Sequence, residues 1–172
     1  MESADVAALV ARCAPTVAPS TMQAILRVES GFKPHVIGYL VRSPQGKFNL
    51  SRQPRSKEEA IAWATWMHAN GYRFDAGPAQ VNSSNFERYG LTPASAFEPC
   101  QNIGAGGAIL TSEYLRAVRK FGPGQYALRA AISSYNSGNY VTGFSNGYVR
   151  HVSNAAAQST RPPLQPQRSA SR

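Results

Sequence analysis

The chain has 172 residues, with 18 Lys and Arg against 9 Asp and Glu and a net charge of +9. This length suits one domain with a core and a short tail. No apolar run is long enough to cross a bilayer, so we expect no stable membrane insertion. The positive charge favours binding to an acidic partner. Nucleic acid, an anionic membrane and the cell wall are all acidic, so the charge alone does not select among them.

The sequence of the first half of the chain predicts helices before and after one β element. Apolar spacing predicts the helices, and Ser20 and Gln23 have the spacing of a capping box. Two β-rich runs, HVIGYLVR and GKFNLSR, are separated by SPQ and predict a hairpin. In chain order we expect a helix over 3–14, a helix from Ser20 to a C-cap at Gly31, the hairpin within 35–55, and a helix from Ser56 to Gly71.

The second half predicts an extended segment followed by helices. In chain order we expect a strand or extended loop over 72–82, short helices near 84–88 and behind Thr92, a long helix over 99–121, and helices over 125–137 and about 145–157. Gly104, Gly106 and Gly107 fall inside the long helix and indicate close approach of another backbone. We predict a domain over 1–158 and a disordered Pro-, Ser- and Arg-rich tail over 159–172.

The N-terminus and the cysteines point to different compartments. MESADVAALVARC lacks the basic start and apolar middle of a secretory signal, so either the protein is cytosolic or Met1 has replaced a natural signal. Cys13 and Cys100 permit one disulfide, which would suit an oxidising compartment, or two buried thiols. The residues alone do not decide between these alternatives.

Among the nine acids, Glu29 is the strongest candidate for chemistry. It continues the apolar stripe of Ile25 and Leu26 at a helix C-terminus, so burial and the helix dipole should both raise its pKa. A carboxyl that is partly protonated near neutral pH can protonate a glycosidic oxygen. Taken alone, however, the position is better explained by a surface Glu or by a core Glu paired with Arg or Lys.

Asp75 is the second acidic residue that is a candidate for chemistry. It could be the second carboxylate of a two-acid glycosidase, although a turn residue before Gly77 is the better interpretation of Asp75 alone. The three histidines lack metal-ligand spacing, neither cysteine joins a CxxC, and no phosphate loop or nucleotide fingerprint occurs. We therefore expect no metal and no cofactor.

Four motifs occur in an order that resembles one family. They are ESGFKP at 29–34, GPAQVN at 77–82, NIGAGGAIL at 102–110 and SYNSGN at 134–139. Together they resemble the soluble lytic transglycosylase domain, a relative of goose-type lysozyme, over residues 3–153. CAP at 13–15, the insert before GPAQVN, FEPCQNI and GYVRHV make the chain similar to the small transglycosylases of type IV secretion systems, which open peptidoglycan for a secretion channel.

The resemblance implies a fold and a set of site residues. The fold would be a predominantly α-helical, lysozyme-like α+β domain, with a small β element inserted after the Glu29 helix and a substrate cleft between that element and the helices. Glu29 would be the single catalytic acid and base, and Ser30 would support its carboxyl by a hydrogen bond. Gln80 would line the sugar site, with Asn82 of the same motif supporting it. Tyr135–Asn136 would face Glu29 and position the substrate N-acetyl group.

The resemblance also implies a reaction. Glu29 would protonate the oxygen between N-acetylmuramic acid (MurNAc) and N-acetylglucosamine (GlcNAc), and the substrate acetamido oxygen would attack the anomeric carbon. Glu29 would then take the proton of the muramyl 6-hydroxyl as the 1,6-anhydro ring closes, with no cofactor. One departure from the family concerns GPAQ, which stands where GLMQ is usual. Pro78 and Ala79 replace Leu and Met, and losing the Met would remove an apolar contact with the sugar.

Three other functions compete with the transglycosylase. A goose-type hydrolase would use Asp75 to help a water attack. A non-catalytic peptidoglycan-binding, secretion-assembly protein would have a site altered at Pro78 and Ala79. The interpretation as a nucleic-acid-binding protein is supported by the net charge alone, because the basic residues are scattered and form no known motif. We therefore expect no nucleic-acid partner.

The transglycosylase interpretation predicts peptidoglycan glycan strands as substrate and secretion-system components as further partners. It also predicts a periplasmic or exported protein. That location in turn favours a disulfide between Cys13 and Cys100.

Overall fold

A computed structural model describes residues 1 and 3–159, so the predicted tail lies outside the described residues apart from Ser159. The helices are α1 (Ser3–Cys13), α2 (Pro19–Ser30), α3 (Lys57–Ala69), α4 (Pro99–Phe121), α5 (Gln125–Ser137), α6 (Thr142–Ser145) and α7 (Tyr148–Ser159). Two antiparallel pairs join β1 (Leu40–Ser43) to β2 (Gly46–Asn49) and β3 (Asp75–Ala76) to β4 (Val81–Asn82). The 3-10 turns are η1 (Ser83–Asn85), η2 (Glu87–Tyr89) and η3 (Ser95–Phe97). The predominantly helical, lysozyme-like α+β fold is confirmed.

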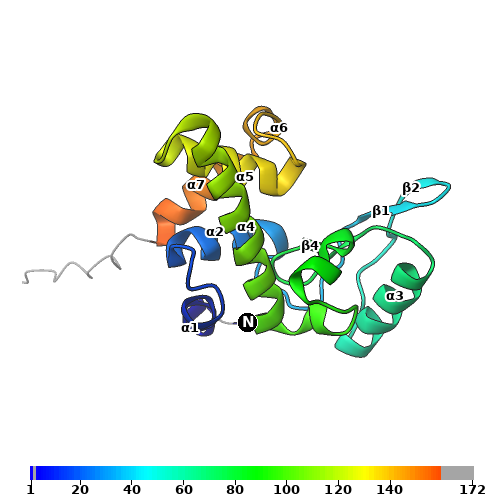
Figure 1. The fold of residues 1–172 in the computed structure, drawn as a ribbon. Coiled ribbons are helices and arrows are strands. Elements are labelled where there is room, and N and C mark those ends of the chain that lie inside the picture. The colour runs from blue at the N-terminus through cyan, green and yellow to red at the C-terminus, as the bar shows by residue number, and fades with distance from the viewer. Residues whose placement is uncertain (2, 160–172) are drawn as a thin grey trace, which may run out of the picture.

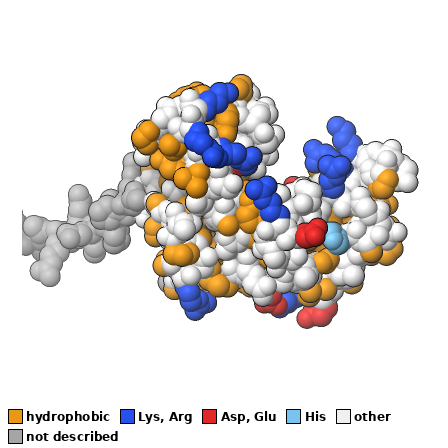
Figure 2. All heavy atoms as spheres, in the orientation of Figure 1, with side chains coloured by type: hydrophobic (Ala, Val, Ile, Leu, Met, Phe, Trp, Pro, Cys, Tyr) orange, Lys and Arg blue, Asp and Glu red, His pale blue; other side chains and the backbone are white. Residues whose placement is uncertain are grey.

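Helix α4 runs through the middle of the molecule (Figure 1). It packs against α5 and α1, while α2 packs against α7. The hairpin β1–β2 and α3 lie on the other side of α4 from α5 and α7 (Figure 1). The surface is hollowed between the α5–α7 helices and the hairpin (Figure 2). This hollow corresponds to the cleft that the family resemblance implies.

Helix α2 is buried on two faces because two apolar clusters meet on it. Met22 and Leu26 belong to a cluster that continues into α1, α3 and the β segments. Ala24 and Ile25 belong to a second cluster with residues of α4, α5 and α7. Neighbouring positions on a helix face different directions, so the apolar residues 24–26 enter both cores and α2 is held between them. The C-terminal end of α2, which carries Glu29, is therefore firmly positioned.

The glycines inside α4 allow the close approach that the sequence predicts. A Cβ on Gly107 would lie 2.8 Å from the Cβ of Ala14, and one on Gly104 would lie 3.1 Å from the carbonyl oxygen of Cys13. The C-terminal end of α1 therefore packs directly on the α4 backbone. A disulfide between Cys13 and Cys100, with Cα atoms 5.3 Å apart, links the same two helices.

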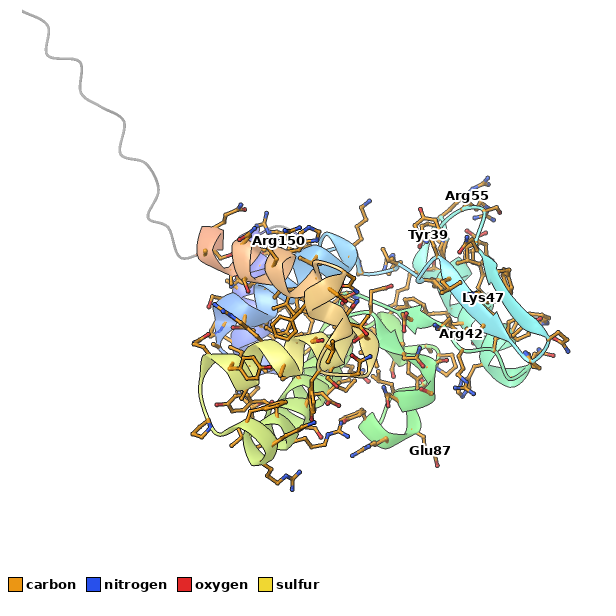
Figure 3. All side chains as sticks on the ribbon, turned by 90° about the horizontal axis from the view of Figure 1, so that it is seen from above. Tyr39, Arg42, Lys47, Arg55, Glu87 and Arg150 are labelled. Carbon is orange, nitrogen blue, oxygen red and sulfur yellow. A yellow bond between two sulfur atoms is a disulfide. The ribbon has the colours of Figure 1, made fainter. Side chains whose placement is uncertain are left out.

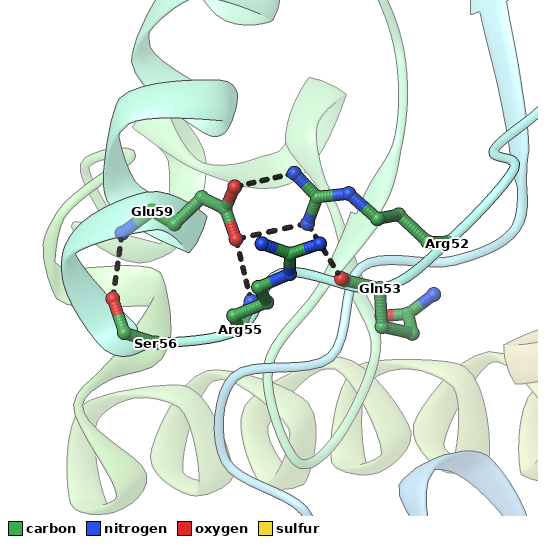
Figure 4. Close-up of polar contacts among 5 residues, drawn as sticks. All are labelled: Arg52, Gln53, Arg55, Ser56 and Glu59. Atoms are coloured by element: carbon green, nitrogen blue, oxygen red, sulfur yellow. Dashed lines mark hydrogen bonds and ion pairs between the residues drawn. The ribbon is translucent and has the colours of Figure 1, made fainter.

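A polar cluster ties the chain after the hairpin to the start of α3 (Figure 4). Glu59 accepts two hydrogen bonds from the Arg52 guanidinium and one from the Arg55 backbone N–H. Ser56 caps α3 by accepting from the Glu59 N–H at 3.2 Å, at the residue where the sequence predicts that this helix begins. Gln53 bonds both the N–H and the carbonyl of Ile37, at 3.0 and 2.7 Å. These contacts fix the segment that enters the hairpin.

Two sequence predictions about helix starts are wrong. Helix α2 begins at Pro19 behind Ala18 and has no side-chain cap, so Ser20 does not cap it; proline at the first helical position suffices. The last predicted helix, about 145–157, begins only at Tyr148 as α7, because Gly147 before it has φ +85°, and the separate short helix α6 was not predicted. The short helices expected near 84–88 and after Thr92 are present as 3-10 turns.

Within the part of the chain that the structure describes, no helix combines the length and apolarity needed to cross a bilayer.

Candidate active site

Glu29 lies in the last turn of α2, and its half-buried carboxyl meets the start of α7. Tyr148, the first residue of α7, is buried and donates a hydrogen bond from its hydroxyl to Oε1 of Glu29. The ion pairs among residues 1 and 3–159 are Arg52–Glu59, Lys57–Glu98 and Arg116–Glu113. Glu29 is therefore not the core Glu paired with Arg or Lys that its stripe position alone favours.

Burial is the main influence on the Glu29 carboxyl. It raises the pKa from 4.5 to about 7, because loss of water disfavours the charged form. The hydrogen bond from Tyr148 lowers the pKa, and the negative charge of Asp75 raises it. A carboxyl with this pKa populates both protonation states at neutral pH, so it can first donate and then accept a proton.

Residues 77–80 form a loop between β3 and β4 that α4 and α5 hold in place. The fully buried Asn102 accepts a hydrogen bond from the Ala79 N–H at 2.8 Å and donates one to the Ala76 carbonyl at 2.9 Å. The Tyr135 hydroxyl donates to the Ala79 carbonyl at 2.6 Å. A Cβ on Gly106 would lie 2.7 Å from the Cβ of Ala79 and 2.9 Å from the Tyr135 hydroxyl oxygen. The loop can therefore sit this close to α4 only because residue 106 lacks a side chain.

The two residues of the GPAQ departure from the family pattern lie inside the protein. Ala79 is fully buried, with its side chain against α4, and Pro78 is buried as well. In this chain residue 79 therefore packs in the core. The exchange of Met for Ala suits the narrow space over Gly106.

Gln80 adopts φ +48° at the end of this loop. Its side-chain Nε2 donates to the carbonyls of Gly77 and Val36, at 2.9 and 3.2 Å. A Cβ on Gly38 would lie 3.3 Å from both Oε1 of Gln80 and Cβ of Asp75. Gly38 therefore leaves room beside these two side chains. Sequence reasoning missed it, although a lone glycine inside a β-rich run indicates such an approach.

Asp75 lies in β3 opposite Asn82 of β4, where the sequence alone favoured a turn residue. Its Oδ1 accepts a hydrogen bond from Asn82 Nδ2 at 2.8 Å. Burial raises the pKa of Asp75, while the bond from Asn82 and the positive charge of Arg42 lower it. Because the charge of Asp75 also raises the pKa of Glu29, the two carboxyls belong to one electrostatic environment.

The other predicted site residues have the following positions. Tyr135 keeps its proton, because burial and then the charges of Glu29 and Asp75 raise its pKa well above the usual value. Asn136 is exposed and accepts a hydrogen bond from Asn146 at 2.9 Å. The Ser30 hydroxyl donates to the Leu26 carbonyl at 3.1 Å. The expected bond from Ser30 to the Glu29 carboxyl is thus replaced by a bond within the helix.

Two residues of this site were not predicted from the sequence. Tyr148 falls within the last predicted helix, and nothing local shows that its hydroxyl reaches α2. Asn102 belongs to one of the four motifs, and its position among apolar neighbours in a helix was the signal that could have revealed it.

Residues 7–157 match the family described as "Transglycosylase SLT domain", and the chain belongs to this family. It is similar to the type IV secretion system protein virB1 of Brucella abortus biovar 1 (strain 9-941), with 47% identity over 160 residues, covering 90% of this chain and 65% of the relative.

A second relative is the protein virB1 of Rhizobium radiobacter, which is 36% identical over 173 residues, covering 95% of this chain and 65% of the relative. The protein virB1 of Agrobacterium fabrum (strain C58) is 37% identical over 161 residues, covering 88% and 59%. The chain thus spans less than two thirds of the length of these curated relatives. A comparison with solved structures found no match. The family resemblance drawn from the four motifs is confirmed.

Proposed function

We propose that this chain is a peptidoglycan lytic transglycosylase that cleaves the β-1,4 bond between MurNAc and GlcNAc and leaves a 1,6-anhydroMurNAc end. The observation that carries the proposal is the Glu29 carboxyl, which has a pKa of about 7, a hydrogen bond from Tyr148 and no ion-pair partner among the described residues. Membership of the transglycosylase SLT domain family supports this class of reaction.

The reaction needs two proton transfers, and Glu29 serves both. Protonated Glu29 gives its proton to the glycosidic oxygen as the bond from that oxygen to the anomeric carbon of MurNAc breaks. The acetamido oxygen of the same sugar forms a bond to that carbon. The muramyl 6-hydroxyl then displaces the acetamido oxygen and loses its proton to the Glu29 carboxylate. The enzyme returns to its starting protonation state, and no water is consumed.

The surrounding groups are assigned supporting roles. The Tyr148 hydroxyl stabilises the Glu29 carboxylate between the two transfers, because a hydrogen bond to the charged form favours that form. Gln80, Asn82 and Asn136 supply amide groups for binding the sugars. Tyr135 holds the loop over 77–80 through the Ala79 carbonyl.

A goose-type hydrolase is the second candidate, and Asp75 is the observation that favours it. This half-buried carboxyl is electrostatically linked to Glu29 and could orient a water. Mass spectrometry of peptidoglycan digested with the full chain separates the two reactions. We expect 1,6-anhydro-muramyl products; products with reducing ends alone would replace our proposal with the hydrolase.

A non-catalytic peptidoglycan-binding protein is the third candidate, based on the altered GPAQ loop. The loop keeps its bonds to Asn102 and Tyr135 with Ala79 in place, which supports an intact site. The same digestion tests this alternative, because a binding protein would release no soluble fragments.

The biological setting is part of the proposal. The similarity to proteins named for a type IV secretion system supports a role in opening peptidoglycan for a secretion or conjugation apparatus. The components of that apparatus would be the partners of this chain. The Cys13–Cys100 disulfide supports a periplasmic or exported location. We assign the catalytic domain to residues 1–158; the predicted tail lies outside the described residues.

A further inference from the structure

Three basic residues lie next to one another across the hairpin and the strand segment beside it. Arg42 of β1 is directly opposite Lys47 of β2. Arg42 also forms a bridge with Arg73, and their backbones exchange hydrogen bonds at 2.9 and 2.8 Å. Directly opposite residues of antiparallel segments project from the same face. The side chains of Arg42, Lys47 and Arg73 therefore form one group, which we call the hairpin cation cluster.

The hairpin cation cluster surrounds an open hollow. Its three side chains line a space of about 580 Å³ together with Ser43, Pro44, Gly46 and Gly71. Lys and Arg side chains gather beside the hairpin in the space-filling view (Figure 2), and Arg42 and Lys47 are seen together on it from above (Figure 3). All three residues are exposed, and none takes part in an ion pair within residues 1 and 3–159. Like charges in opposite positions destabilise a strand pair, so an anion in this hollow would relieve repulsion.

The hairpin cation cluster is a neighbour of the proposed active site. Gly38 touches Asp75 and Gln80, and its N–H donates to the Asp75 carbonyl at 2.8 Å. Arg73, the bridge partner of Arg42, precedes Asp75 by two residues in the segment that leads into β3, which corresponds to about 7 Å of extended chain. The charge of Arg42 also acts on the Asp75 carboxyl. A substrate bound at Glu29 could therefore reach the hollow with a short side branch.

We propose that the hairpin cation cluster binds the carboxylates of the stem peptide that branches from the muramyl residue. This inference rests on the proposed function, because it assumes that Glu29 acts on a muramyl glycan. The glycan backbone itself offers few charges, whereas stem peptides carry free carboxylates. The planar guanidinium groups of Arg42 and Arg73 can bind a carboxylate through two parallel hydrogen bonds, and Lys47 adds a point charge.

A binding experiment with two polymers tests the proposal without turnover. The parent is the full chain with Glu29→Gln, and the test variant adds Arg42→Gln, Lys47→Gln and Arg73→Gln. The matched control adds Arg12→Gln, Arg119→Gln and Arg129→Gln, which removes the same charge from exposed residues of α1, α4 and α5. Sedimentation with intact peptidoglycan, and with peptidoglycan whose carboxylates have been converted to amides by carbodiimide coupling to ethanolamine, gives the affinities, because both polymers stay cross-linked and insoluble.

We expect the test variant to bind intact peptidoglycan roughly tenfold more weakly than the parent, and amidated peptidoglycan as well as the parent does, because three exposed charge contacts with carboxylates are lost. The control should match the parent on intact peptidoglycan. Equal weakening on both polymers, no weakening, or the same weakening in the control would overturn the stem-peptide site. A parent that binds neither polymer would overturn the proposed function and this inference with it. Far-ultraviolet circular dichroism checks that each variant is folded.

Discussion

The Tyr148 hydroxyl donates a hydrogen bond to Oε1 of Glu29, joining the first residue of α7 to the last turn of α2 across 119 positions of sequence. This bond favours the charged carboxylate, whereas burial and the charge of Asp75 favour the neutral acid. The pKa of about 7 results from this opposition. Neither protonation state dominates at neutral pH, which suits a group that must act as acid and then as base.

Replacing Tyr148 by Phe should raise the pKa of Glu29 above about 7, because the carboxylate loses its hydrogen-bond donor while the ring stays in place. The free enzyme needs protonated Glu29, so the alkaline limb of the profile of kcat/KM against pH should move to higher pH. Turbidity loss of peptidoglycan suspensions across pH measures this limb. Tyr126→Phe, at an exposed tyrosine of α5, is the control and should leave the profile unchanged. A limb that stays or moves to lower pH would contradict the assigned role of Tyr148.

Replacing Glu29 by Gln should lower the rate of peptidoglycan cleavage by at least about 10²-fold, because Gln can make neither proton transfer. Release of soluble fragments measures the rate. Glu87→Gln makes the same chemical change at an exposed carboxylate of η2, at the outer edge of the molecule in Figure 3, and should retain full activity. Retained activity in the Glu29 variant would show that another group carries the chemistry.

The same Glu29→Gln variant should be more stable than the wild type at high pH. The folded-state pKa of about 7 lies above 4.5, so the unfolded chain ionises first as pH rises. The contribution of protonated Glu29 is fully present below about pH 4.5 and is lost as pH rises through about 7. The variant should therefore match the wild type near pH 4 and exceed it by on the order of 3 kcal/mol above pH 7. Urea unfolding at both pH values measures the difference, and a difference that does not change with pH would contradict the raised pKa.

Replacing both Cys13 and Cys100 by Ser should lower the free energy of unfolding by about 2–4 kcal/mol, because the disulfide restricts the unfolded chain. Thermal unfolding with and without a reducing agent measures this. The reductant should lower the Tm of the wild type and leave that of the double variant unchanged. A thiol count on the unreduced wild type provides a direct check, and finding two free thiols would rule out the bridge.

Replacing Gly106 by Ala should destabilise the fold by about 1–3 kcal/mol, because the new Cβ would fall 2.7 Å from the Cβ of Ala79. The Tyr135 hydroxyl, 2.9 Å from the same point, should also move, so cleavage should slow together with the loss of stability. Gly104→Ala is the comparison, because a Cβ on residue 104 has one close contact, the Cys13 carbonyl oxygen at 3.1 Å. This variant should lose less stability than Gly106→Ala. Equal effects of the two variants would contradict the tight packing of the loop on α4.

Most helices were predicted from the sequence because their signals are local. Apolar spacing and the glycines at 31 and 122 predicted where α2 and α4 end, and both ends are confirmed. The errors fall at helix starts, as at Gly147, where a positive φ delays the start of the final helix to Tyr148. The sequence also does not show that Glu113 accepts a hydrogen bond from Ser134 at 2.7 Å and keeps only 13% of its side chain exposed.

The sequence by itself determined the helices, the hairpin, the family and the choice of Glu29, because periodicity, turn residues and ordered motifs are all written along the chain. Only the tertiary structure decided what surrounds that carboxyl. It showed that the hydrogen bond to Glu29 comes from Tyr148 and not from Ser30, and that Asp75 is held by Asn82. These contacts depend on which distant segments are brought together by packing on α2 and α4. No local pattern in the sequence encodes which of these segments meet.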